Sequence, residues 1–248
     1  IKKHINCLKK VAVIRDNRFH YSGDVKLNNP EVKNFNVSIL ESFDSVVVTS
    51  DYLRKSISSI YENMNLSVIG NPVDDLGVIR KECEGVGELP GFNILIIGMI
   101  TENKGQVQFI KNLHQNIKGN EALKIHMVGR GLRIEERIKY FAKKFNIEDK
   151  IFMHGFLSRL DTYKMIKKCQ LVVLPTFWDE PFGRVPLESA MMGKPVVSFK
   201  RGGLVESIIN NKTGILVEAG DYKQFFDHII ELKNNPIKRL EMGKIANE

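Results

Sequence analysis

Residues 170–199 read QLVVLPTFWDEPFGRVPLESAMMGKPVVSF. The run at 170–175 is short, apolar and closed by a proline, and the run PVVSF at 195–199 has the same character. Strands that are apolar throughout are typical of parallel sheets whose two faces are both covered. A loop and a helical segment at 186–193 join the two runs, so a right-handed strand–helix–strand unit is expected. The stretch therefore predicts part of a parallel α/β sheet.

The same alternation continues on both sides of this unit. The further strands expected are 93–98, 123–129, 150–155 and 214–217. The further helices expected are 104–117, 132–145, 158–169, 204–210 and 221–234. Such alternation predicts a doubly wound, Rossmann-like domain that binds its ligand at the carboxyl ends of the strands.

The first part of the chain is less regular. Strands are expected at 11–14, 44–50 and 66–72, with a helix over 52–63 capped by Asp51. These are too few strands to close a sheet. We therefore expect four parts: a partial N-terminal, acceptor-side α/β domain (1–73), a hinge or linker (74–91), the Rossmann-like domain (92–234) and the start of a C-terminal helix (235–248).

Composition excludes several classes of protein. Hydrophobic residues are 43% and charged residues 27%, as in ordered globular domains. No apolar run approaches the roughly 20 residues of a membrane helix. The three cysteines are far apart and lack metal-ligand spacing, so neither a disulfide framework nor a zinc site is expected. The expected location is therefore a reducing cytoplasm. The net charge of +8 is spread along the chain, which suits phosphorylated ligands or an anionic membrane surface better than nucleic acid, and solvated surface lysines without a partner explain it equally well.

Two glutamates flank a candidate anion site. Glu180 lies in the loop after a strand, and Glu188 lies one turn inside the next helix, in whose first turn Pro186 is tolerated. Gly183 lets a ligand approach the backbone, and the N–H groups of 182–185 face out of the helix start. Two glutamates at this spacing are common, and on their own they are far better explained as a solvated helix residue and an ordinary loop acid. With the anion site between them, they match a nucleotide sugar, which has a diphosphate between two hydroxyl-bearing rings.

The stretch EPFGRVPLESAMMGKPVV resembles the signature of the large retaining glycosyltransferase family ("group 1", family 4 type) typified by bacterial mannosyl- and glucosyltransferases of the GT-B fold. Similar segments follow the family's order: IGMITENKGQ (97–106), HMVGRG (126–131), IFMHGFLS (151–158) and RGGLVESIINNKTGILV (201–217). DSVVVTSDYLRKSI and VIGNPVD resemble the end of the family's first domain and its hinge. The resemblance covers nearly the whole chain. It implies a GT-B architecture whose first domain is incomplete, so that much of the acceptor site lies outside this sequence.

The resemblance also implies roles for individual residues. Glu180 would hold the hydroxyls of the transferred sugar, and Lys104 would neutralise the leaving diphosphate. The implied donor-binding residues are Phe182, Gly183, Arg184 and Val185 at the sugar and diphosphate, Glu188 at the ribose, Gly129 and Arg130 near the nucleoside, and Phe156 and Leu157 at the base. His154 either contacts the nucleoside or is a satisfied histidine at a strand end, and the second reading is favoured.

Two positions depart from the family pattern. Met99 stands where the family usually has an arginine that assists the lysine, which leaves Arg184, Arg130 or Arg201 to compensate. Arg15–Asp16 stands where the family often has a histidine–aspartate pair, so no histidine contact to the sugar is expected there.

The predicted function is that of a retaining hexosyltransferase using a nucleotide sugar such as a UDP-sugar. No metal is expected, because no Asp-x-Asp pair stands at the matched strand ends. The expected partners are the donor and a sugar or lipid-linked glycan acceptor, with peripheral contact at the inner face of the membrane and no nucleic acid. The alternatives are a non-catalytic nucleotide-sugar-binding module and a GT-B nucleotide-sugar epimerase. The base, the sugar, the acceptor and the oligomeric state stay open.

Overall fold

A computed structural model describes residues 9–16, 30–61, 64–116 and 123–247. The chain forms two compact units. The first comprises residues 1–72 with the short segments 179–183 and 202–206, and the second comprises 73–178, 184–201 and 207–248.

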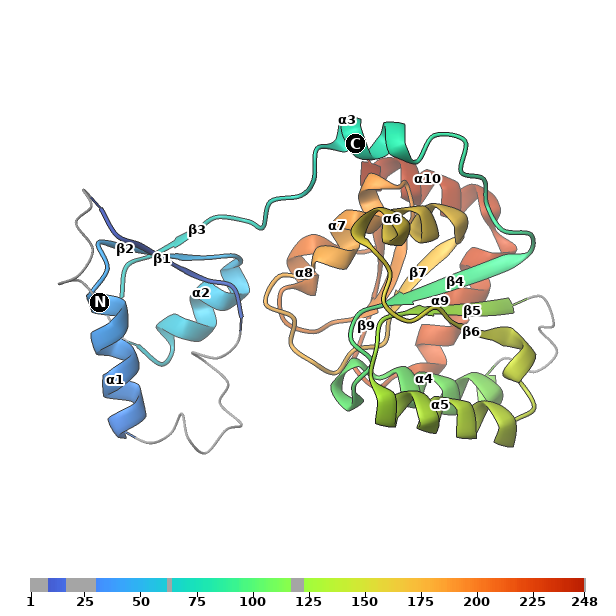
Figure 1. The fold of residues 1–248 in the computed structure, drawn as a ribbon, viewed down its shortest axis with the longest axis horizontal. Coiled ribbons are helices and arrows are strands. Elements are labelled where there is room, and N and C mark those ends of the chain that lie inside the picture. The colour runs from blue at the N-terminus through green and yellow to red at the C-terminus, as the bar shows by residue number, and fades with distance from the viewer. Residues whose placement is uncertain (1–8, 17–29, 62–63, 117–122, 248) are drawn as a thin grey trace. The chain divides into compact units, whose positions relative to one another are not determined.

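The second unit is built on a parallel sheet of six strands (Figure 1). The strands are β4 (Phe92–Ile97), β5 (Leu123–Val128), β6 (Ile151–Met153), β7 (Leu171–Leu174), β8 (Val196–Phe199) and β9 (Gly214–Val217). They lie in the order β6-β5-β4-β7-β8-β9. Strands β5 and β6 extend to one side of β4, and β7, β8 and β9 to the other, which is the doubly wound order with a switch point between β4 and β7.

Helices cover both faces of this sheet (Figure 1). One layer contains α4 (Gln106–Asn116), α5 (Leu132–Lys144) and α9 (Tyr222–Asn234), and the other contains α6 (Arg159–Lys168), α7 (Arg184–Met191) and α10 (Pro236–Asn247). Phe109 of α4 packs edge-on against Phe225 of α9, and both are fully buried. Short helices lie at Leu76–Glu82 (α3), Glu102–Lys104 (η3), Glu148–Lys150 (η4) and Leu204–Ser207 (α8).

The first unit has a parallel sheet in the order β1-β2-β3. Its strands are β1 (Val11–Ile14), β2 (Ser45–Val48) and β3 (Leu66–Val68), and its helices are α1 (Pro30–Glu41) and α2 (Asp51–Ser58). Ala12 pairs with Val46, which pairs with Leu66. These residues face a core with Leu40, Leu53 and Ile57 from the two helices.

The structure confirms every strand that the sequence predicts, with ends that agree or differ by up to four residues. The predicted helices differ at their ends by up to five residues. Asp51 is the first residue of α2 rather than its cap, because the Oγ of Ser50 accepts the N–H of Leu53 (3.0 Å). Helix α7 begins at Arg184, so Pro186 is its third residue, still within the turn whose N–H groups have no helical partner. Helix α8 ends at Ser207, not at 210.

Two helices were missed. The segment PEVKNFNVSILE of α1 is rich in Asn and Val, which have weak intrinsic helix propensity. Helix α3 lies in the segment that the sequence marks as a linker. It has seven residues and depends on Asp75, whose carboxylate accepts the N–H groups of Gly77 (2.8 Å) and Val78 (3.2 Å). Such a short helix has too little periodicity to be seen in a sequence.

Candidate active site at the switch point of the second unit

The loops that follow β4 and β7 meet at the switch point of the sheet. The carbonyl of Asn103, after β4, accepts the N–H groups of Phe177 (2.8 Å) and Trp178 (3.0 Å), after β7. Ligands of doubly wound sheets bind in the crevice outside the carboxyl ends of the strands at this point. The topology therefore selects these two loops as the centre of the candidate site.

Lys104 lies in this contact. It ends the short helix η3, and Gly105 follows it in the left-handed conformation (φ 75°). A Cβ at Gly105 would lie 1.9 Å from the carbonyl oxygen of Pro175. Only glycine lets the two loops approach so closely, and the approach places Lys104 at the switch point.

The loops after β4 and β5 also pack backbone against backbone. A Cβ at Gly129 would lie 1.8 Å from the carbonyl oxygen of Gly98. The N–H of Ile100 donates to the carbonyl of Arg130 (2.9 Å). The Arg130 side chain is exposed, so its charge is available to a ligand at this edge.

The loop after β6 presents an exposed ring. Phe156 is 72% exposed, and Leu157 beside it is half-buried. The loop is tied to its neighbour because the N–H of Gly129 donates to the carbonyl of Gly155 (2.8 Å). An exposed aromatic ring at the carboxyl edge of a sheet can pack against a flat ligand group such as a base.

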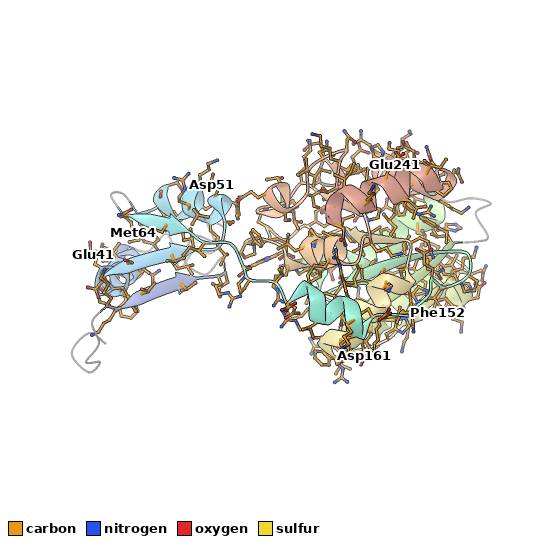
Figure 2. The ribbon with its side chains drawn as sticks, turned by 90° about the horizontal axis from the view of Figure 1, so that it is seen from above. Glu41, Asp51, Met64, Phe152, Asp161 and Glu241 are labelled. Carbon is orange, nitrogen blue, oxygen red and sulfur yellow. The ribbon has the colours of Figure 1, made fainter. Side chains whose placement is uncertain are left out.

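His154 is engaged inside the second unit. Its Nε2 lies 2.9 Å from Nδ1 of His126, a buried residue of β5. The ring of His126 also stacks on Phe152 of the edge strand β6, which Figure 2 labels. These contacts support the favoured reading of His154 as a satisfied histidine at a strand end.

Helix α7 carries the second glutamate of the signature. Arg184 begins the helix, and one of its guanidinium nitrogens lies 3.3 Å from the carboxylate of Glu188. The Nε of Arg184 is buried and makes no hydrogen bond with the described residues. Glu188 is largely buried, with a side-chain exposure of 16%.

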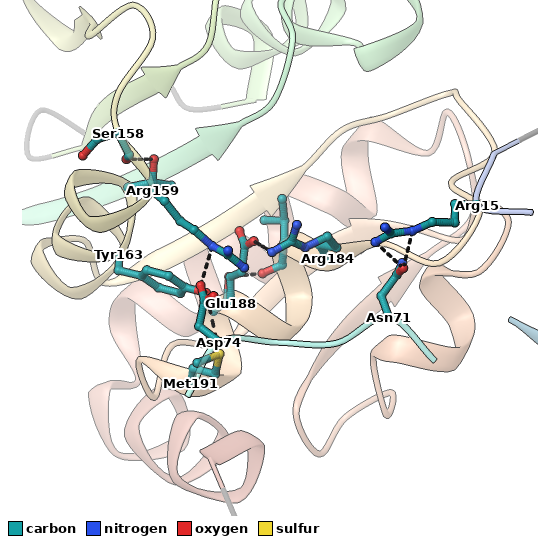
Figure 3. Close-up of polar contacts among 12 residues, drawn as sticks. Arg15, Asn71, Asp74, Ser158, Arg159, Tyr163, Arg184, Glu188 and Met191 are labelled. Atoms are coloured by element: carbon teal, nitrogen blue, oxygen red, sulfur yellow. Dashed lines mark hydrogen bonds and ion pairs between the residues drawn. The ribbon is translucent and has the colours of Figure 1, made fainter. Parts of the chain in front are cut away.

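Three residues near Glu188 were missed in the sequence. Figure 3 shows Arg159, the first residue of α6, beside Asp74 of the linker and Glu188. Arg159 pairs with Asp74, and the hydroxyl of Tyr163 donates to the same carboxylate (2.9 Å). The only sequence signal was the acid run at 74–75, which lies far from α6 along the chain.

Burial dominates the electrostatics of this cluster. It raises the pKa of Glu188, while Arg184 and Arg159 oppose the increase and Asp74 adds to it. Burial, the hydrogen bond to Asp74 and the nearby Glu188 raise the pKa of Tyr163 to about 12. Tyr163 is therefore a neutral donor at physiological pH, and the two arginines favour the ionised form of Glu188.

The segment 179–183 contains the other half of the signature and groups with the first unit. Glu180 is half-buried, and its carbonyl accepts the N–H of Gly203 (2.6 Å). Phe182 is half-buried, and Gly183 has a φ of 85°. Val185, the second residue of α7, is half-buried in the other unit.

The structure shows the exposure and the contacts of the positions that depart from the family pattern. The Met99 side chain is 68% exposed after β4. Among the arginines considered as substitutes, Arg201 donates from Nε to the carbonyl of Phe177 (3.0 Å), which holds it beside the loop after β7. Arg15 donates through two nitrogens to the side-chain oxygen of Asn71 (3.2 and 3.0 Å), so it is engaged within the first unit.

A cavity in the first unit lies away from the ends of the strands where ligands bind. It measures about 560 Å³ and is lined by residues such as Leu40, Tyr61 and Met64 at the amino end of β2. Parallel sheets bind their ligands at the carboxyl ends of the strands. We therefore do not assign the cavity to the donor.

The fold is the GT-B fold that the resemblance implies. The sequence profile of the family "Glycosyl transferases group 1" matches residues 89–248. The chain belongs to this family.

The chain is similar to curated glycosyltransferases and to solved structures. An uncharacterized glycosyltransferase of Methanocaldococcus jannaschii is 27% identical over 83% of this chain and 54% of its own length. An alpha-1,3/1,6-mannosyltransferase of Dictyostelium discoideum is 29% identical over 54% of this chain and 34% of its own length. The crystal structure of Anabaena HepE with UDP and glucose has a TM-score of 0.79 at 20% identity, over 96% of this chain and 65% of that one. The chain spans about half the length, or less, of these curated relatives.

None of the described helices has the length and apolarity needed to span a bilayer.

Proposed function

We propose that this chain is the donor-binding part of a retaining glycosyltransferase. It would move a hexose from a UDP-sugar to a hydroxyl of a sugar or lipid-linked glycan. The observation that carries the proposal is the convergence of Lys104, the loop after β5 and helix α7 with Glu188 at the carboxyl edge of one parallel sheet. UDP as the nucleotide is supported by the fold's likeness to HepE, which was solved with UDP-glucose.

Each group has a role in this proposal. Lys104 and the N–H groups of Arg184 and Val185 stabilise the diphosphate, since a helix start and a cation both favour an anion. Glu188 accepts the ribose hydroxyls, and Glu180 accepts hydroxyls of the sugar with the backbone of Phe182 and Gly183. Gly129, Arg130, Phe156 and Leu157 line the nucleoside.

The reaction takes place on one face of the sugar. The bond between the anomeric carbon and the diphosphate oxygen breaks as the acceptor oxygen forms its bond on the same face. The acceptor's proton goes to the departing diphosphate, so no protein nucleophile is required. Lys104 and the helix start stabilise the charge that develops on the leaving group, which replaces the role of a metal ion.

A nucleotide panel and a product assay test the proposal on the full-length protein. UDP should raise the melting temperature more than GDP, ADP or dTDP, because a ligand of the native state stabilises it in proportion to affinity and concentration. Incubation with UDP-sugars and lipid-linked glycans should release UDP and form a product with the donor's anomeric configuration, and EDTA should not reduce the rate. An inverted product would contradict the retaining mechanism, and loss of activity in EDTA that Mg²⁺ restores would contradict metal independence.

Glu188→Gln should weaken UDP binding at least tenfold, because a carboxylate accepts hydrogen bonds more strongly than an amide. Glu241→Gln on the exposed face of α10 is the matched control and should bind UDP as the wild type does. Equal UDP affinity in Glu188→Gln and the wild type would remove Glu188 from the donor site.

Met99 favours one other function, a non-catalytic module that binds a nucleotide sugar for a partner. The family's usual arginine would add a second cation to the diphosphate site, and the exposed Met99 adds none. UDP binding without UDP release in the presence of donors and acceptors would favour this alternative.

The proposed donor and acceptor also suggest where in the cell the protein acts. We propose a cytoplasmic protein that acts at the inner face of the membrane in the synthesis of a surface polysaccharide or glycolipid. The spread positive charge of the chain supports contact with an anionic surface. Sedimentation with vesicles containing anionic lipid, but not with neutral vesicles, is the expected outcome.

A further inference from the structure

Glu188 is useful to a donor only when it is ionised, yet its surroundings disfavour the ion. Its side chain is 16% exposed, and burial penalises a carboxylate. A protonated Glu188 would keep one hydroxyl donor and lose much of its capacity to accept hydrogen bonds from a ribose. Groups that favour the carboxylate over the protonated form therefore bear directly on the proposed donor role of Glu188.

Three elements bring charged or titratable groups to Glu188. Its own helix supplies Arg184 at 3.3 Å. Helix α6 supplies Arg159 and Tyr163, and the linker supplies Asp74. Among these groups the two arginines favour the carboxylate, and Asp74 opposes it.

Arg159 is held by a contact outside the donor site. Its Nε pairs with Asp74, whose carboxylate also accepts the Tyr163 hydroxyl (2.9 Å). Figure 3 shows Arg159 beside both Asp74 and Glu188. Ser158 caps α6 immediately before Arg159, accepting the N–H of Asp161 (3.1 Å), so the backbone that carries Arg159 is fixed as well.

We propose that Arg159, which pairs with Asp74 of the linker, is a positioning residue that keeps Glu188 in its ionised, hydrogen-bond-accepting form. The role in nucleotide binding rests on the proposed function, whereas the charge state of Glu188 can be measured without a ligand. Arg159 and Asp74 act on Glu188 with opposite signs, and this is the feature that a merely structural contact would not reproduce.

The test is a carboxyl-carbon NMR titration of Glu188 in the full-length, ¹³C-glutamate-labelled protein, assigned with Glu188→Gln. Arg159→Gln should move the titration of Glu188 to higher pH by about one unit or more, because one of its two favourable charges is lost. Asp74→Asn should move it to lower pH, because a repelling charge is lost while the amide oxygen can still accept from Tyr163. Arg159→Lys keeps the charge and should restore most of the wild-type value.

Arg137→Gln is the matched control. It removes the same charge from an exposed ion pair with Glu102 in the same unit and should leave the titration of Glu188 unchanged. Unchanged titration of Glu188 in Arg159→Gln, or shifts of the same sign in Arg159→Gln and Asp74→Asn, would overturn the inference.

A second readout is UDP binding from pH 5 to pH 8. The acid limb of UDP affinity should move with the Glu188 titration in each variant, and Arg159→Gln should bind UDP several-fold more weakly at pH 6 than at pH 8. If the NMR shifts appear but Glu188→Gln binds UDP as the wild type does, the proposed donor role of Glu188 fails while the electrostatic role of Arg159 stands.

Discussion

Lys104 lies at the switch point of the second unit, in the same loop as the uncharged Met99. It lies in the loop that contacts the strand end at Pro175, and the side chain at position 99 is an exposed methionine. A diphosphate leaving group gains charge as its bond to the sugar breaks. A preorganised cation at that point stabilises the transition state more than the ground state.

We therefore predict that Lys104→Ala lowers kcat by about 10²–10³-fold, the usual cost of removing one such stabilising group. The measurement is the rate of UDP release from the donor in the presence of acceptor. Lys139→Ala, an exposed lysine of α5, removes the same charge and should leave kcat unchanged. A Lys104→Ala enzyme with the wild-type rate would remove the lysine from the mechanism.

At the scale of the elements, the site depends on loops that approach without side chains between them. Gly129 adopts a φ of 145°, and a Cβ there would lie 1.8 Å from the carbonyl oxygen of Gly98. Hydrogen bonds hold both backbone segments in place. The N–H of Gly98 donates to the carbonyl of Val128 (3.0 Å), and the N–H of Gly129 donates to the carbonyl of Gly155 (2.8 Å). The loops after β4, β5 and β6 are thus one connected backbone structure.

Gly129→Ala should destabilise the protein by about 2–4 kcal/mol, because a strained φ and a backbone clash add. Urea unfolding of the full-length protein measures the loss. Gly87→Ala is the control, since a Cβ there has no atom within 4 Å and no left-handed φ, and it should change stability by less than about 0.5 kcal/mol. Equal stability of the two variants would show that the loops are not held as described.

At the scale of the whole molecule, a chain of polar groups runs through the second unit from the linker to β6. The side-chain amide of Asn93 donates to the carbonyls of Leu89 (3.2 Å) and Pro90 (3.3 Å), so its oxygen faces Nε2 of His126 (3.0 Å) and accepts from it. His126 must then accept from His154 at Nδ1 (2.9 Å). A second proton, on Nδ1 of His126, would remove the lone pair that accepts the hydrogen bond from His154. Burial and the neighbouring His154 lower the pKa of His126 to about 4.

Stability should therefore fall as the solution becomes acidic. The folded-state pKa of His126 lies below its ordinary value of 6.5, so between pH 6.5 and pH 4 the unfolded chain binds more protons than the folded one. The free energy of unfolding should drop by about 2 kcal/mol from pH 7 to pH 5 through His126. Urea unfolding at the two pH values should show a smaller difference in His126→Gln than in His114→Gln, an exposed histidine of α4. The same difference in both variants would contradict the assignment.

The sequence alone determined the strands of both units and the alternation of strands and helices in the second. Their apolar runs, bounded by glycine or proline, are local signals of about six residues that need no knowledge of the partner strand. The resemblance likewise led to the family and to Lys104 and Glu188 as candidates, because those residues lie in contiguous motifs. Helix α1 was missed since its residues have weak helix propensity, and α3 since it is short.

Only the tertiary structure brought Asp74, Arg159 and Tyr163 together beside Glu188. Asp74 and Tyr163 are 89 residues apart, and no local pattern marks either as a partner of the other. Hydrogen bonds and ion pairs depend on where the chain returns in space, whereas strand and helix periodicity depends on neighbours along it. For the same physical reason, the sequence named Glu188 and Arg184, whereas only the fold brought Arg159 and Asp74 beside them.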